Sequence, residues 1–473
     1  MLLASEGFVK IPYSDIFTDM GIKEKLGSIL SKLKRAKPVL TEEKRAAVKS
    51  VSLSDEAWET LFNLYQELGP RPAGSESAAR AVKAIKKQID KVVPDAKVTN
   101  FRLVPRLWLC LSNLAVLFSI AMSAATAFGL PYVGLVLGIG ITVLVAMNLS
   151  CGNGFIKMIF PAKQGSNIHV QLDPVGEVKR TVIFSAHHDS APLELKETTE
   201  ELLLKNYYLS AMAVIVSGIY SIAALCVELT RGYVVMPNMP CIGDIIMLAV
   251  SCLFLIPQAL VIRNRKRAPF SGGAGDDLSG VSVVIELLRY YRSEPQNGTR
   301  LIFVSFDGNE CGAQGAASWY AANKDLLVNA VNINFEGLFN EENLVFLAAD
   351  GNGMVPLSEV LASRCSRLAD SMGYTVPVAN LGLLGGMTDA VAAANAGIDS
   401  TTITSMAPGV KTVAHTEGDL PVTVSKKAMA RAMEIVIRYV KEIDGFRPRP
   451  QQAALEAPVS LLDDDKKYKL SKY

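Results

Sequence analysis

The sequence contains the stretch Val182-Ile183-Phe184-Ser185-Ala186-His187-His188-Asp189-Ser190, an apolar run that ends in imidazole and carboxylate side chains. A short continuous apolar run is typical of a strand buried on both faces, as in a parallel sheet. Alternation along a strand places His187 and Asp189 on the same side, where Asp189 can orient and polarise the imidazole. Taken alone the pair indicates little, because a buried structural histidine is the commoner case.

Further segments with strand and helix patterns follow the same scheme. We expect strands at 169–172, 301–306 and 331–335, and helices at 281–292 and 313–323. Strands that alternate with helices predict an α/β fold, with a mostly parallel sheet covered by helices on both faces. In such sheets the functional residues gather at the carboxyl ends of the strands.

The apolar residues are concentrated in long uncharged runs. Half of the 473 residues are hydrophobic and 20% are charged, and residues 107–156 carry no charge. Gly129-Leu130-Pro131 interrupts this run near its middle. A bilayer-spanning helix needs roughly 20 apolar residues, so the run predicts a transmembrane hairpin, and two later runs predict a second. Buried core helices are the alternative, but these are usually shorter. The predicted spans are 107–128, 132–150, 206–227 and 245–262.

Basic residues predict the orientation of these hairpins. They precede the first span and follow the second and fourth spans, whereas the first hairpin loop has no charge and the second has one arginine. The basic residues that flank the spans are Arg102, Arg106, Lys157, Lys163, Arg263, Arg265, Lys266 and Arg267. By the positive-inside rule both loops face outward, and both termini and the rest of the chain are cytoplasmic. We therefore expect a multi-pass protein of the cell membrane.

Charge and cysteine content exclude several function classes. The 48 basic and 46 acidic residues nearly cancel, so no overall field favours nucleic acid. The seven cysteines form no C-x-x-C pair, which argues against a disulfide framework and against a thiolate zinc site. Transport through the four spans is disfavoured because they carry no internal charge.

Five short motifs follow one another along the chain. They are Leu68-Gly69-Pro70-Arg71-Pro72-Ala73-Gly74-Ser75, His187-His188-Asp189-Ser190, Gly275-Asp276-Asp277-Leu278-Ser279-Gly280, Asn334-Phe335-Glu336-Gly337 and His415-Thr416-Glu417-Gly418-Asp419. In this order they resemble the di-zinc aminopeptidase family, peptidase family 28, which includes bacterial leucyl aminopeptidases, glutamate carboxypeptidase and glutaminyl cyclases. The resemblance implies a zinc-peptidase fold with the two hairpins inserted into it. Taken singly, Asp276 is equally well read as a helix N-cap.

The resemblance implies a site for two Zn²⁺ ions. By it, Asp276 bridges the two ions. His187 and Glu336 complete one metal position, and Glu310 and His415 complete the other. Oxygen and imidazole donors suit zinc, and a closely spaced metal pair can activate a water molecule.

Asp389 is the candidate substrate-binding residue. It ends the segment Gly385-Gly386-Met387-Thr388-Asp389, which resembles the substrate-pocket segment of the family. An ordinary turn carboxylate is an equal alternative.

The general-base position departs from the family. The family has E-E-x-G-x-x-G, whereas this chain has Asp307-Gly308-Asn309-Glu310-Cys311-Gly312-Ala313-Gln314-Gly315. Aligning the two glycines puts Glu310 at the ligand and Asn309 at the base, and an amide cannot take a proton from the metal-bound water. A shifted alignment makes Glu310 the base and Cys311 a ligand, but loses both glycines. Three explanations stay open: weak catalysis, a substitute carboxylate such as Asp307, or an engineered residue.

We therefore expect a membrane-bound zinc peptidase, an aminopeptidase-type hydrolase that cleaves peptides with a two-metal-activated water. The alternative is a catalytically silent receptor or scaffold with the same fold. Peptide and the lipid bilayer are the expected partners, without nucleic acid, and the oligomeric state stays open. The expected organisation is a polar segment 1–53, a peptidase domain at 54–106, 151–205 and 263–445, transmembrane hairpins at 107–150 and 206–262, and a polar tail 446–473.

Overall fold

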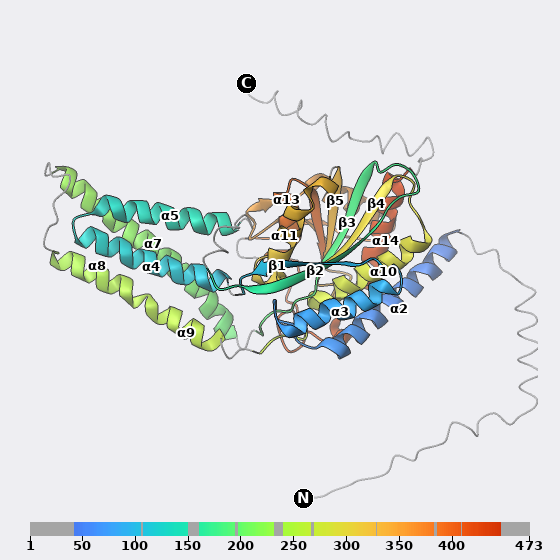
Figure 1. Ribbon diagram of the computed structural model, residues 1–473, viewed down its shortest axis with the longest axis horizontal. Coiled ribbons are helices and arrows are strands. Elements are labelled where there is room, and N and C mark those ends of the chain that lie inside the picture. Colours follow the sequence, from blue (N-terminus) through green and yellow to red (C-terminus); the bar gives the residue numbers. More distant parts are fainter. Residues whose placement is uncertain are drawn as a thin grey trace, which may run out of the picture. The chain divides into compact units, whose positions relative to one another are not determined.

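The structure is a computed structural model of the chain. It describes residues 42–105, 107–149, 160–193, 197–230, 240–265, 269–327, 329–382, 386–407 and 409–445. Most of the predicted polar segment 1–53 and all of the predicted tail 446–473 lie outside these residues. From Ser52 onward the described residues belong to one unit, which holds an α/β part and a bundle of apolar helices (Figure 1).

A nine-stranded mixed sheet is the centre of the α/β part, in the order β1-β2-β4-β3-β5-β9-β6-β7, with β8 paired to β6. The strands are β1 (Lys97–Leu103), β2 (Lys163–Leu172), β3 (Arg180–His187), β4 (Thr299–Phe306), β5 (Ala330–Glu336), β6 (Val345–Asp350), β7 (Val355–Pro356), β8 (Val378–Asn380) and β9 (Asp399–Thr404). The four central strands, β4, β3, β5 and β9, are parallel, as predicted. On either side of them, β2 pairs antiparallel with β4 and β6 pairs antiparallel with β9, which makes the whole sheet mixed.

Helices cover both faces of the sheet, which explains the continuous apolar run in β3. Val182 and Phe184 pack into a core with α2, α3, α10, α12 and α14. Ile183 points to the other face, where it packs with α11 and α13. The helices are α2 (Glu42–Leu68), α3 (Glu76–Asp90), α10 (Ser279–Ser293), α11 (Gln314–Ala322), α12 (Glu359–Ser371), α13 (Ala390–Asn395) and α14 (Lys426–Ile443). The predicted α/β fold is therefore confirmed, including the helices at 281–292 and 313–323.

The bundle consists of α4 (Leu107–Ala127), α5 (Pro131–Leu149), α7 (Glu197–Thr230), α8 (Ile242–Leu253) and α9 (Leu255–Arg265). Three helical stretches are long and apolar enough to cross a membrane: Leu109–Ala127, Tyr208–Thr230 and Ile242–Arg263. Within α5, the stretch Pro131–Val145 is also apolar, but it is shorter than these three. The predicted turn between the first two helices is present, because Gly129 has a positive φ of 71° and α5 begins at Pro131.

Small polar side chains connect the helices of the bundle. The Ser123 hydroxyl lies 2.7 Å from that of Ser251 on α8, and the Ser112 hydroxyl lies 2.6 Å from that of Ser210 on α7. Gly134 on α5 lets the helices approach closely, since a Cβ there would lie 2.7 Å from the Ser221 hydroxyl oxygen on α7. Small residues and hydroxyl contacts at helix interfaces are typical of helices that pack within a membrane.

Candidate metal centre

The five predicted ligands converge at the carboxyl ends of the parallel strands. His187 ends β3 and Glu336 ends β5, while Glu310 lies in the short helix Asn309–Cys311 that follows β4. Asp276 lies in the turn Ala274–Leu278 before α10, and His415 lies in the loop after β9. This is the edge of the sheet at which parallel α/β folds carry their functional residues.

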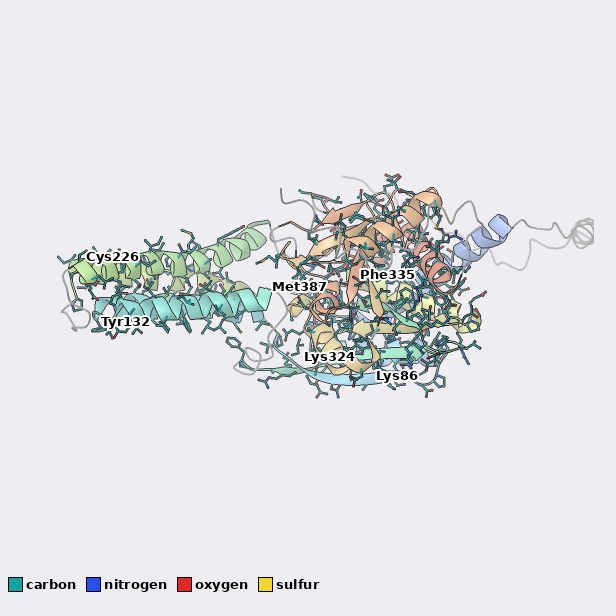
Figure 2. The ribbon with its side chains drawn as sticks, turned by 90° about the horizontal axis from the view of Figure 1, so that it is seen from above. Lys86, Tyr132, Cys226, Lys324, Phe335 and Met387 are labelled. Carbon is teal, nitrogen blue, oxygen red and sulfur yellow. The ribbon has the colours of Figure 1, made fainter. Side chains whose placement is uncertain are left out.

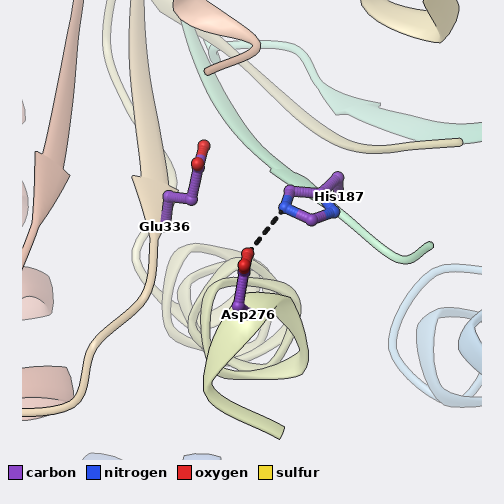
Figure 3. A group of neighbouring side chains, drawn as sticks. All are labelled: His187, Asp276 and Glu336. Atoms are coloured by element: carbon purple, nitrogen blue, oxygen red, sulfur yellow. Dashed lines mark hydrogen bonds and ion pairs between the residues drawn. The ribbon is translucent and has the colours of Figure 1, made fainter. Parts of the chain in front are cut away.

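Three of these side chains form a buried group (Figure 3). His187 Nε2 lies 3.1 Å from Asp276 Oδ1, and each of the two residues offers one ligand atom within 4.8 Å of that of Glu336. All three are buried. We call this set the buried position.

Asp276 also belongs to a second group. Its other carboxylate oxygen lies 2.9 Å from His415 Nε2, and the same imidazole nitrogen lies 3.6 Å from Glu310 Oε1. The ligand atoms of these three residues again fall within 4.8 Å of one another. We call this set the open position, because the His415 side chain is 38% exposed whereas that of His187 is 1% exposed.

Asp189 connects the two positions. Its Oδ1 lies 3.3 Å from His187 Nδ1, on the side of the ring that faces away from Asp276. The same carboxylate accepts hydrogen bonds from the backbone N–H groups of Asn309 and Glu310, both at 3.1 Å. One carboxylate therefore orients a candidate ligand of the buried position and holds the loop that carries a candidate ligand of the open position.

Two residues of the quoted motifs, Arg71 and Asp419, have roles that the sequence did not reveal. The buried Arg71 guanidinium donates to the carbonyls of His188 and Gly273, and so ties the segment after His187 to the segment before Asp276. The Asp419 carboxylate accepts from the backbone N–H of Asp276 at 3.3 Å. Their places inside the first and last motifs are the signal that could have found them.

The protonation of this cluster depends on burial and on the histidines. Burial opposes ionisation of Asp276, but hydrogen bonds from His187 and His415 outweigh it and hold the pKa of Asp276 well below its usual range. Burial raises the pKa of Glu310 to about 7 and that of Glu336 well above its ordinary value. Buried carboxylates this close together are costly without a compensating cation. The imidazole and carboxylate donors therefore fit zinc, which would stabilise the ionised form of these buried carboxylates.

The structure separates the alternatives for the missing base. Two backbone N–H groups, of Gly74 and Ser166, donate to the Asp307 carboxylate at 3.4 Å and 3.2 Å, on the side of β1 and β2. Cys311 packs against an apolar cluster that contains Phe101, whereas Glu310 joins the open position. The contacts thus favour the glycine-based alignment, and they do not bring Asp307 to the candidate ligands.

Asn309 and Asp389 are neighbours. Burial raises the pKa of the Asp389 carboxyl to about 7. Asp389 directly precedes α13, but its side chain does not cap that helix. Met387 and Thr388, which belong to the same quoted segment, line the cavity next to the candidate ligands, whereas Asp389, the residue singled out from the sequence, is fully buried and does not line it.

That cavity has a volume of about 980 Å³. Asp276, Glu310, Glu336 and His415 form one part of its wall together with Asn309. Residues of α4, α5 and α7 form another part. Figure 2 shows Met387 on the side of the α/β part that faces the bundle, and Phe335, of β5, within the α/β part.

Comparison with known proteins gives related peptidases. Residues 260–440 match the family described as Peptidase family M28. Aminopeptidase YwaD of Bacillus subtilis is 28% identical over 193 residues, which are 39% of this chain and 40% of the relative. The chain thus matches about two fifths of the length of that relative.

Solved structures with a similar arrangement include an aminopeptidase from Aneurinibacillus sp. strain AM-1, with a TM-score of 0.49 and 14% identity over 85% of this chain and 98% of that one. A zinc aminopeptidase from Bacillus subtilis gives a TM-score of 0.49 and 16% identity, covering 84% and 96% of the two chains. A glutaminyl cyclase from Fimbriiglobus ruber gives 0.47 and 14%, covering 82% and 94%. The match over residues 260–440 includes the last three of the five motifs and agrees with the resemblance that they carry: this part of the chain is similar to peptidase family M28.

Proposed function

We propose that this chain is a membrane-bound zinc peptidase that removes residues from the amino end of peptides. The observation that carries the proposal is the position of Asp276, which offers one carboxylate oxygen to the buried position and the other to the open position. A bridging carboxylate of this kind is what a two-metal hydrolase requires.

The proposed ligands are His187, Asp276 and Glu336 for one zinc ion, and Asp276, Glu310 and His415 for the other. When bound, such a pair supplies Lewis acidity, an activated water and stabilisation of the attacking and leaving oxygens. The chain's own residues hold this arrangement. Asp189 fixes the ring of His187, and the cavity next to Glu310 leaves room for the substrate.

Asn309 limits the proposed chemistry. A general base at this position would accept a proton from the attacking water, and an amide cannot do so. We therefore infer that the chain binds zinc and peptide and hydrolyses peptide slowly. The second candidate function, a peptidase-like receptor or scaffold without turnover, is favoured by the same residue.

The proposed location is the cell membrane, with the peptidase domain and both termini in the cytoplasm and the hairpin loops near Pro131 and Pro237 outside. Large apolar side chains cover the outside of the bundle, and Val136, Ile219 and Ile245 are each at least 60% exposed. Exposed large apolar side chains on several helices favour lipid over water. Tyr132 and Cys226, near the tips of the two hairpins, lie at the same end of the bundle (Figure 2). Position 237 and several of the basic residues used for the orientation lie outside the described residues.

Metal content and turnover test the function together. The purified chain should contain about two zinc ions by elemental analysis and should release the fluorophore from a leucyl-coumarin amide. Asp276→Asn should lose zinc and turnover, while Asp370→Asn, a change at an exposed site on α12, should keep both. Zinc binding without any turnover would favour the scaffold, and absence of zinc would refute the metal site.

The orientation needs a separate test. In a cysteine-free background, a cysteine introduced at Tyr132 should react with an impermeant maleimide added outside intact cells. A cysteine introduced at Lys467 should react only after the cells are opened. The reverse pattern would refute the proposed topology.

A further inference from the structure

The first apolar helix is tied directly to the loop that carries Glu310. Val104, just before α4, donates its N–H to the Gln314 side-chain oxygen at 3.0 Å and accepts from the Gln314 amide nitrogen at 3.0 Å. The same amide nitrogen lies 2.7 Å from the carbonyl of Cys311, the residue after Glu310. The buried Gln314 side chain therefore connects the segment just before α4 to the residue that follows Glu310.

The second hairpin also begins and ends at the site. The chain leaves His187 toward α7 and returns from α9 toward Asp276. On the way the two segments pair, because Leu193 donates its N–H to the carbonyl of Pro269 at 2.8 Å and Ser271 donates to Ala191 at 2.9 Å. Both hairpins are thus anchored within a few residues of candidate ligands, which places the site at the face of the α/β part from which the apolar helices leave.

The cavity beside the candidate ligands joins these two regions. Its polar end carries the carboxylates of Asp276, Glu310 and Glu336. Its apolar end is formed by helix residues that include Leu111, Ala115, Ile141, Val145, Val214 and Ile215. The volume of about 980 Å³ is large for a ligand site, for which roughly 300–1,000 Å³ is typical. A substrate that fills it contacts acidic groups at one end and aliphatic side chains of the bundle at the other.

We propose that the substrates are apolar peptides, with the amino end at the proposed zinc ligands and the following side chains against α4, α5 and α7. This inference rests on the proposed peptidase function and adds the substrate class. The aliphatic wall gains free energy by burying apolar side chains. The proposed zinc ligands line the other end of the cavity, so a peptide whose amino end lies at these ligands extends its following side chains toward the bundle. A fatty-acid amide is the competing occupant, and the test includes it.

The test uses the full chain in lipid nanodiscs loaded with zinc. Two pentapeptides start with the same leucine: one continues with four apolar residues (Leu-Leu-Val-Leu-Val) and the other with four polar ones (Leu-Ser-Gln-Ser-Gln). Leucyl-coumarin amide reports turnover without any extension. The apolar pentapeptide should show a kcat/KM at least about tenfold higher than the polar one, and fluorescence anisotropy of labelled peptides should show the same order of Kd, since one buried large side chain gives about this factor.

Matched substitutions separate the cavity from simple enrichment of apolar peptides in the bilayer. Ala211 lines the cavity on α7, while Ala223 on the same helix is exposed and does not line it. Ala211→Trp should lower the preference for the apolar pentapeptide about tenfold, because the indole fills the space that the substrate needs. Ala223→Trp should leave that preference unchanged.

The possible results test the apolar substrate class separately from the peptidase activity. Hydrolysis of the coumarin amide with equal rates and affinities for both pentapeptides would refute the apolar substrate class and leave the peptidase intact. A preference that Ala211→Trp does not reduce would also refute it, because enrichment in the bilayer would then explain the effect. Tighter binding of a fatty-acid amide than of the apolar peptide would assign the cavity to lipid amides. No turnover of any substrate would refute the peptidase, and anisotropy would still report the peptide preference.

Discussion

The two candidate metal positions share Asp276 and differ in almost everything else. The buried position takes His187 and Glu336 from the last residues of neighbouring parallel strands, where the sheet fixes both backbones. The open position takes Glu310 from the short helix Asn309–Cys311 and His415 from the loop after β9, and both of these side chains line the cavity. Of the two ligands that belong to the buried position alone, Glu336 lines the cavity and His187 does not. On the proposed function, we expect a division of labour: the sheet would hold one ion firmly, and the segments after β4 and β9 would present the other to substrate.

The largest effect is expected where the two positions meet. Asp276→Ala removes the bridging carboxylate from both, so the zinc content should fall from about two ions per chain to nearly none, and turnover should fall below detection. Elemental analysis of the purified variant checks this. Retention of a single ion would show that the two positions do not depend on a common ligand.

Asn309→Glu should raise the rate of hydrolysis without changing zinc binding at either position. The added carboxylate restores a general base on the loop of the open position, and such assistance is typically worth about two to four orders of magnitude in rate. The zinc content should not change. The matched variant Asn309→Gln, which adds the same length without charge, should stay as slow as the parent. An equally slow Asn309→Glu variant with normal zinc would favour the scaffold.

Asp189→Asn should weaken both positions, because Asp189 touches His187 and also holds the loop of Glu310. Loss of an outer partner of this kind typically costs about 10–100-fold in metal affinity. Titration against a fluorescent zinc chelator should show two weakened sites. If only one site weakens, Asp189 serves a single position.

Removal of one histidine at a time should rank the positions. His187→Ala should weaken the tighter of the two zinc sites, and His415→Ala the looser one, because the buried ligands keep their geometry without metal. The same chelator titration resolves the two sites. A reversed order would overturn the division of labour stated above.

The smallest effect concerns pH. In the metal-free chain Glu310 has its pKa raised to about 7 by burial, against an ordinary value of 4.5. A carboxyl with a raised folded-state pKa stabilises the fold fully below pH 4.5, and this contribution is lost as the pH rises through about 7. The metal-free Tm should therefore fall over this range, while the increase in Tm on adding zinc should grow. Glu310→Gln should flatten the part of the slope due to this residue.

The sequence predicted the site residues that lie at the carboxyl ends of the parallel strands. His187 and Glu336 follow apolar strand runs, and parallel strands bring such ends together without further information. Gln314 and Arg71 are different, because their importance lies in hydrogen bonds to residues far away in the chain, such as Val104 and Gly273. Nothing in the residue type or spacing indicates these partners.

The cavity could not be predicted from the sequence either. Apolar runs predicted four spans, but period and hydropathy do not tell which side of a helix faces a distant loop. The direction of the Asp307 side chain was equally inaccessible. It is set by the backbone N–H groups of Gly74, in the turn before α3, and of Ser166, on β2.

The order of the ligands along the chain has a consequence for biosynthesis. His187 is made before α7, whereas Asp276 and the three remaining candidate ligands follow α9 in the chain. A nascent chain therefore lacks Asp276 until every apolar helix described here has been synthesised. A chain that ends before one of these helices also lacks the carboxylate that the two candidate positions share.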